Sequence, residues 1–143
     1  MAITQAICNT FKQQLFEGIH DFEIGGDTFK LALYESTATI DSGTTVYTTS
    51  GEVSSAGTNY TAGGGTLSSL GVALSTNTAF LDFNDLTFAN VTLTARGCLI
   101  YNSTEANKAV AVFDFGSDKT ATSGDFTVIF PPGAAATAVI RLV

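Results

Sequence analysis

Tryptophan is absent from this chain of 143 residues, which also has only one histidine, two prolines and two cysteines. Basic residues are few as well: six Lys and Arg are outnumbered by 13 Asp and Glu, for a formal net charge of −7. Such a chain repels phosphate backbones and anionic lipid, so we expect neither nucleic acid nor a membrane surface as a partner. No run approaches the ~18 apolar residues of a membrane span.

The two cysteines, Cys8 and Cys98, lie far apart and lack the CxxC or Cys/His spacing of a zinc site. A long-range disulfide is one alternative, and two free buried thiols are the interpretation that we favour. The first residues, MAITQAICNTFKQQ, lack the basic segment and the unbroken apolar stretch of a signal peptide. We therefore expect synthesis in a cytoplasm, which also fits a particle that is assembled there and later released.

Apolar residues are plentiful, at 45% of the chain, while charged residues make up only 13%. This balance excludes an intrinsically disordered chain. Hydroxyl side chains dominate the polar residues, with 22 Thr and 11 Ser, and β-branched Thr favours strands. The length suits one domain over residues 1–143, with a core that requires neither disulfides nor metals.

Helical periodicity occurs only near the N-terminus. With Thr4 as a cap and Gly18 as a stop, it predicts a helix over about 4–17. Such a helix is too short to be stable alone, so it packs either on its own sheet or, as an arm, on a neighbouring subunit. Its apolar stripe recurs every four residues and consists of Ile3, Ile7, Phe11 and Leu15.

After residue 26 the apolar period switches to two, which is typical of strands. Gly97 and the pairs 116–117 and 123–124 are interpreted as turns between them. Short strands without intervening helices predict an all-β fold, an antiparallel β-sandwich or jelly-roll-like domain over about 27–143. The expected strands are 27–35, 46–48, 59–61, 67–74, 78–83, 91–95, 98–101, 109–115, 126–130 and 138–143.

The only histidine limits acid–base chemistry. His20 follows the predicted helix, and we interpret it as a solvated side chain whose charge suits the helix dipole. A Ser-His-Asp triad lacks a supporting G-x-S-x-G motif, and a dyad with Cys98 is disfavoured because the run GCLIY is typical of buried core.

A glycosidase carboxylate pair and a sugar site are also weakly supported. The carboxylates are scattered among turn residues, and aromatic platforms would have to come from tyrosine. The residues concerned are Glu17, Glu23, Glu35, Glu52 and Glu105, and Tyr34, Tyr47, Tyr60 and Tyr101.

Three other segments have plain structural interpretations. Residues 82–85 lack the spacing of a calcium loop and are interpreted as a tight turn. The glycines at 63–65 are interpreted as a flexible turn, because no Lys-Ser/Thr pair and no helix follow to bind phosphate. Arg96 needs a carboxylate partner, and Asp114 is one candidate. We therefore assign no catalytic, cofactor-binding or metal-ligating residue and expect no enzymatic activity.

Six segments spread over nearly the whole chain have a familiar combination of strand and turn motifs. They are DTFKLALYES (27–36), EVSSAGTNYTAGGGTL (52–67), FLDFNDLTF (80–88), TARGCLIYN (94–102), AVAVFDFGSDKT (109–120) and DFTVIFPP (125–132). Together they resemble a family of small virion structural proteins of tailed bacteriophages. The resemblance implies a non-enzymatic particle component, with capsid decoration (cement) as the preferred role, and it carries over no functional residues.

A decoration protein would have the major capsid protein and copies of itself as partners, and the virion as its location. We expect a homotrimer, because icosahedral shells present many local threefold positions where three equal contacts add. The alternative is a tail- or fibre-associated adhesin or carbohydrate-binding module. Exposed aromatic side chains clustered on one face would favour the binding module, whereas a broad apolar contact patch would favour the decoration protein.

Overall fold

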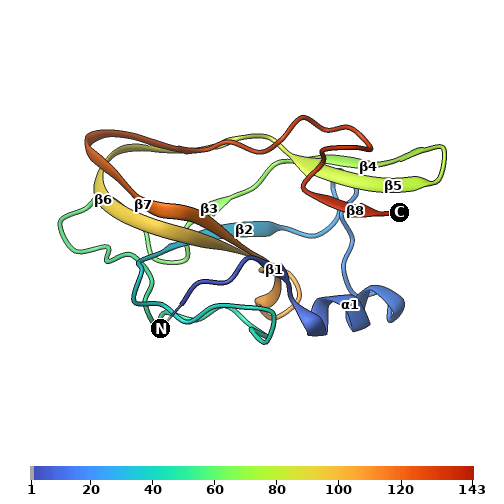
Figure 1. Ribbon diagram of the computed structural model, residues 1–143, viewed down its shortest axis with the longest axis horizontal. Coiled ribbons are helices and arrows are strands. Elements are labelled where there is room, and N and C mark those ends of the chain that lie inside the picture. The colour runs from blue at the N-terminus through green and yellow to red at the C-terminus, as the bar shows by residue number, and fades with distance from the viewer. Residues whose placement is uncertain (1) are drawn as a thin grey trace.

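Two antiparallel sheets and one short helix make up the computed structural model, which describes residues 2–143 (Figure 1). The predicted all-β sandwich is confirmed. The five-stranded sheet has the order β1 (Ala6–Ile7), β7 (Lys108–Val128), β6 (Leu86–Asn102), β2 (Phe29–Tyr34) and β3 (Gly65–Thr66). The three-stranded sheet has the order β4 (Ser69–Ser75), β5 (Thr78–Phe83) and β8 (Ile140–Leu142). The helix α1 spans Asn9–Phe16.

The core is centred on β2, which pairs with β6 on one side and with β3 on the other. The expected alternation of β2 is present, but side chains on both of its faces are buried: Leu31 and Leu33 on one face, Ala32 and Tyr34 on the other. The long loop between β2 and β3 binds this strand, since the N–H of Val53 donates to the carbonyl of Leu33 (2.9 Å).

Strands β6 and β7 form one long bent ribbon instead of the four shorter strands that we predicted. The interpretation of Gly97 as a turn is wrong, because it lies inside β6. A Cβ atom there would lie 2.5 Å from the carbonyl oxygen of Phe113, so glycine serves the close approach of two strands. Residues 116–117 and 123–124 likewise lie inside β7, where the register shifts of the ribbon take the place of turns.

Threonine supplies cross-strand pairs on the exposed side of this ribbon. The hydroxyls of Thr87 and Thr127 lie 2.9 Å apart, as do those of Thr94 and Thr120. Each pair joins residues that are directly opposite in the register, an arrangement that stabilises a sheet. These pairs give part of the unusual threonine content a structural role.

The N-terminal helix is shorter than the predicted 4–17. Residues 6–7 form β1 instead, which pairs with Val112 and Ala111 of β7, and Cys8 is the N-cap in place of Thr4. The edge of β7 has free backbone groups that can form hydrogen bonds with residues 6–7 only if these residues are extended. Pairing with a distant strand therefore overrides the helical periodicity of the apolar residues. Gly18, with a φ of 69°, follows the helix end as predicted.

The helix packs on its own domain, which decides between the two alternatives left by the sequence. Phe11 is 1% exposed and contacts the rings of His20 and Phe22 at centroid distances of 4.9 and 5.9 Å. Ile7 and Leu15 are partly buried against the same core. The apolar stripe is therefore satisfied within one chain.

The strands predicted at 46–48 and 59–61 are absent from the loop between β2 and β3. Val46 makes only an isolated bridge to Lys108, and Asn59 has a φ of 63°, which a strand does not allow. Scattered backbone hydrogen bonds, such as that from the N–H of Tyr47 to the carbonyl of Asn107 (2.9 Å), hold this loop together with side-chain contacts in place of a continuous ladder.

Candidate interaction surface

The helix α1 lies opposite the three-stranded sheet at one end of the protein (Figure 1), and most of the exposed large apolar residues belong to these elements or to the segments joined to them. Among the residues that the structure describes, nine large apolar side chains are exposed, and seven of them belong to this end. Such a concentration is a candidate interaction surface, whereas single exposed apolar residues need no explanation. We call these seven residues the apolar end: Phe16, Ile24, Leu70, Val72, Leu74, Leu142 and Val143.

A groove of about 250 Å³ opens at the apolar end, between α1 and the three-stranded sheet. On the sheet side, the register places Val72 beside Leu81 and Ile140, and Ala79 beside Leu142, so that all five share one face. The opposite wall consists of Phe11, Leu15, His20, Asp21 and Phe22. The groove therefore continues the exposed apolar surface toward the core.

His20 lines this groove with a half-buried imidazole ring. Its Nδ1 lies 3.0 Å from Nδ2 of Asn102, and its Nε2 lies 2.8 Å from Oε1 of Gln14. Because the Asn102 amide donates, Nδ1 accepts and Nε2–H donates to Gln14, which is the neutral tautomer. Burial lowers the pKa of His20 from its ordinary value of 6.5, although the carboxylate of Asp27 opposes the shift. The predicted solvated, charged histidine is therefore wrong.

The neutral state of His20 predicts a pH dependence of stability. The unfolded chain takes up a proton near pH 6.5, while the folded protein resists it, so the free energy of unfolding should fall as the pH drops below that value. The loss should stop below the lowered pKa. The free energy of unfolding, measured with urea at several pH values between about 7.5 and about 5, should change less steeply with pH for His20→Gln than for the original protein. Identical slopes would contradict the neutral assignment.

The tyrosines do not form a sugar-binding platform. Tyr34, Tyr60 and Tyr101 are at most 3% exposed, and half-buried Tyr47 stacks on Tyr101 with ring centroids 4.8 Å apart. The hydroxyl of Tyr34 donates to the carbonyl of Thr48 (2.6 Å), inside the long loop. Their hydroxyls are thus used within the protein.

Glu52 is the centre of this tyrosine cluster, a role that no local sequence pattern indicated. Its carboxylate accepts hydrogen bonds from the hydroxyls of Tyr47 (2.6 Å) and Tyr60 (2.8 Å) and from the N–H of Gly63 (2.7 Å). Burial, and then the neighbouring carboxylate, raise the pKa of both tyrosines, which stay protonated donors. The cluster fastens the loop between β2 and β3 to the core.

The other glutamates are distributed over the surface. Three of them are exposed: Glu17 directly after α1, Glu23 in the segment between α1 and β2, and Glu35 directly after β2. Glu105 is half-buried in the loop between β6 and β7, and its carbonyl oxygen accepts a hydrogen bond from the N–H of Lys108 (3.2 Å). Glu52 is thus the glutamate with the clearest role, and that role is structural.

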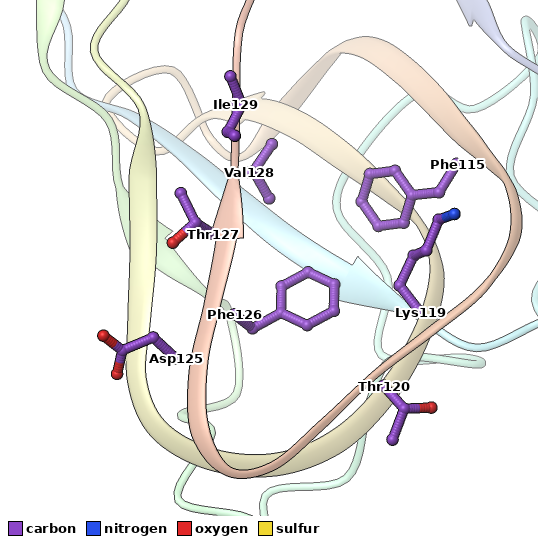
Figure 2. A pocket seen from close by; sticks show the side chains of 8 residues that line it. All are labelled: Phe115, Lys119, Thr120, Asp125, Phe126, Thr127, Val128 and Ile129. Atoms are coloured by element: carbon purple, nitrogen blue, oxygen red, sulfur yellow. The ribbon is translucent and has the colours of Figure 1, made fainter.

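A second recess of about 420 Å³ lies inside the bend of β7 (Figure 2). The rings of Phe115 and Phe126 lie across it with centroids 6.1 Å apart, and Lys119 lies beside Phe115. Asp125 points away from Lys119, and its Oδ1 accepts a hydrogen bond from the N–H of Asn90 (3.2 Å). The Asp125 carboxylate thus links β7 to β6.

Residues 84–85 connect the two sheets, because β5 belongs to the small sheet and β6 to the large one, while residues 82–83 are the end of β5 and do not form the predicted tight turn. Asp85 accepts a hydrogen bond from the N–H of Phe130 (2.8 Å), and Asp82 accepts one from Phe83 (2.8 Å). Asp82 is 3% exposed, its Oδ2 has no hydrogen-bond partner within residues 2–143, and burial raises its pKa. The described part of the chain holds no group of three or more His, Cys, Asp or Glu side chains placed to share a metal ion.

The interpretation of Cys8 and Cys98 as free buried thiols is confirmed. Burial raises the pKa of Cys8 to about 11 and raises that of Cys98 as well, so both are poor nucleophiles. The candidate partner of Arg96 is also confirmed: its Nε donates to Oδ1 of Asp114 (3.1 Å). The N–H of Gly116 and then the guanidinium lower the pKa of Asp114.

Over residues 2–143, no helix has the length and apolar content needed to cross a membrane. A scan against protein-family models and searches of curated proteins and of solved structures give no match. The apolar end, with its groove, is thus the feature of this structure that points most directly to a role.

Proposed function

We propose that this protein is a non-enzymatic structural component of a tailed-phage particle, a capsid decoration (cement) protein that binds the outside of an assembled head. The observation that carries the proposal is the apolar end, because seven of the nine exposed large apolar residues within 2–143 belong to the elements at this end. A protein that adds to a finished shell needs a contact surface of this kind, because burial of apolar area drives association.

Two further features support the proposal. The segments that resemble phage virion proteins include β2, β3 and most of the β6–β7 ribbon, which form most of the five-stranded sheet. The low charge of the chain, 13% of residues, lets a large area be covered without burying unpaired charges. The protein would be made in the host cytoplasm and become part of the virion, with the major capsid protein and copies of itself as partners.

The proposed oligomer on the head is a homotrimer. Three copies around a local threefold position make three equal contacts, and weak contacts then add through avidity. The number of copies per head, measured by quantitative gel analysis of purified particles, tests this stoichiometry.

Heads that lack this protein should still form but rupture at a lower temperature or on low-salt shock. Adding the purified protein back should restore resistance. Leu142→Asp, at the apolar end, should fail to bind heads, whereas Ile129→Asp should bind. Ile129 is a matched control, because it is 76% exposed outside the apolar end and Leu142 is 60% exposed.

Two outcomes would contradict the decoration role. One is labelled protein found only at the tail tip. The other is mutant heads of unchanged robustness combined with a failure of host attachment. Either result would favour the adhesin alternative.

A further inference from the structure

Strand β4 is an open edge of the three-stranded sheet, and its residues 72–75 are exposed. Thr76 and Asn77 form a two-residue connection to β5, with Ser75 paired to Thr78. The pair that closes such a turn is hydrogen-bonded, and hydrogen-bonded pairs then alternate along the ladder. Ala73 and Ser75 therefore direct their backbone groups to β5, while Val72 and Leu74 direct theirs away from the sheet.

Residues 72–75 of this edge lack charged and proline protection against pairing with another chain. Exposed edges are commonly protected by lysine, proline or inward-pointing charge. Residues 53–81, which include all of β4 and its turn, contain no charged residue and no proline. A register shift between Ser69 and Val72 limits the regular open edge to 72–75.

The charge distribution permits contact with a second copy of the same chain at this edge. Two copies repel each other overall, since each has a formal net charge of −7. Contact at an uncharged strand avoids placing like charges opposite one another, which would destabilise a sheet. Pairing at residues 72–75 therefore places no like charges of the two strands opposite one another.

We propose that two copies associate by antiparallel pairing of their β4 strands around a twofold axis at Ala73. In this register Val72 lies opposite Leu74 of the second copy, and the outward backbone groups of both residues find partners. The side chains of Val72 and Leu74 stay on the groove face of both sheets. The two small sheets then form one continuous sheet of twice the width.

The exposed area at this edge sets the strength of the contact. Four apolar side chains at this edge are between 47% and 74% exposed: Ile24, Leu70, Val72 and Leu74. Together with the strand backbone they offer roughly several hundred Å² of contact area on each copy. This area is smaller than the ~800 Å² that each partner buries in an interface of standard size. The pairing is therefore weak in solution and depends on concentration. It goes beyond the proposed function, because it is an isologous contact between two copies, whereas the proposed trimer needs a separate head-to-tail surface.

Cysteine cross-linking of the purified protein tests the register. Across the proposed axis, Ala73 of the two copies forms a non-hydrogen-bonded pair with Cα atoms about 4.5 Å apart, within disulfide range. The matched control is Ser75→Cys on the same strand and face, because the two copies of residue 75 are offset by about 13 Å along the strands. The native thiols Cys8 and Cys98 are 0% exposed and should not contribute.

Under mild oxidation, Ala73→Cys should form disulfide-linked dimers about tenfold faster than Ser75→Cys. Equal rates, or no dimer from either variant, would overturn the proposal. In sedimentation velocity, the original protein should show dimer growing with concentration and Leu74→Lys should stay monomeric, with unchanged circular dichroism. A monomer at every concentration of the original protein would also overturn it.

These measurements need no phage particles, so they separate this inference from the proposed function. Heads protected by a protein that never pairs through β4 would contradict the inference alone. Cross-linked Ala73→Cys dimers together with unprotected heads would contradict the decoration role alone.

Discussion

Phe11→Ala should lower the free energy of unfolding by about 3–5 kcal/mol, because it empties a buried aromatic site. Phe11 is 1% exposed, and its ring packs against His20 and Phe22. The removed ring also forms part of one wall of the groove, so the vacated space cannot be filled without moving α1. Urea unfolding monitored by circular dichroism measures the change.

The helix supplies its own control in Phe16, which is 95% exposed. Phe16→Ala makes the same chemical change in the same helix, so it should alter stability by no more than about 0.5 kcal/mol. Equal effects of the two substitutions would contradict the packing of α1 on its own domain. Phe16 belongs to the apolar end, so Phe16→Ala should instead weaken binding to heads.

Gly64→Ala should cost on the order of 3–5 kcal/mol, from the strain of a left-handed backbone together with overlap of a buried group. Gly64 has a φ of 79°, and a Cβ atom there would overlap the carbonyl oxygen of Leu31 in β2. The loop would have to move away from β2, which would disturb the Glu52 cluster next to it. Thermal and urea unfolding measure the loss.

Gly57→Ala is the matched control for this substitution. Gly57 has a φ of 73° and lies in the same loop, but a Cβ atom there would meet nothing within 4 Å. Its cost should be limited to the backbone strain, about 1–2 kcal/mol. A similar loss for both variants would show that the close approach of Gly64 to β2 has no energetic weight.

The local sequence pattern was enough where the structure of an element depends mainly on its own residues. The alternation in 29–34 and 78–83 predicted β2 and β5, because period two is a property of any half-buried strand. The apolar runs around Cys8 and Cys98 likewise predicted buried thiols. In each case the prediction required only that apolar side chains be buried, and it did not depend on which residues surround them.

Sequence reasoning was wrong where long-range pairing competed with a local signal. Residues 6–7 fit a helical stripe, yet the free edge of β7 binds them as β1. Gly97 fits a turn, yet it lies where the carbonyl of Phe113 comes too close for a side chain. Which edge is open, and which backbones approach, depends on the arrangement of all the strands.

The sequence by itself determined the all-β class, the burial of Phe11 and of both thiols, and the net negative charge of −7 that disfavours nucleic acid as a partner. Only the tertiary structure decided that Glu52 gathers the hydroxyls of Tyr47 and Tyr60, that His20 is neutral, and that exposed apolar side chains meet at one end. The reason is physical: periodicity reports which face of an element avoids water, whereas a cluster or a surface depends on which distant elements share that face.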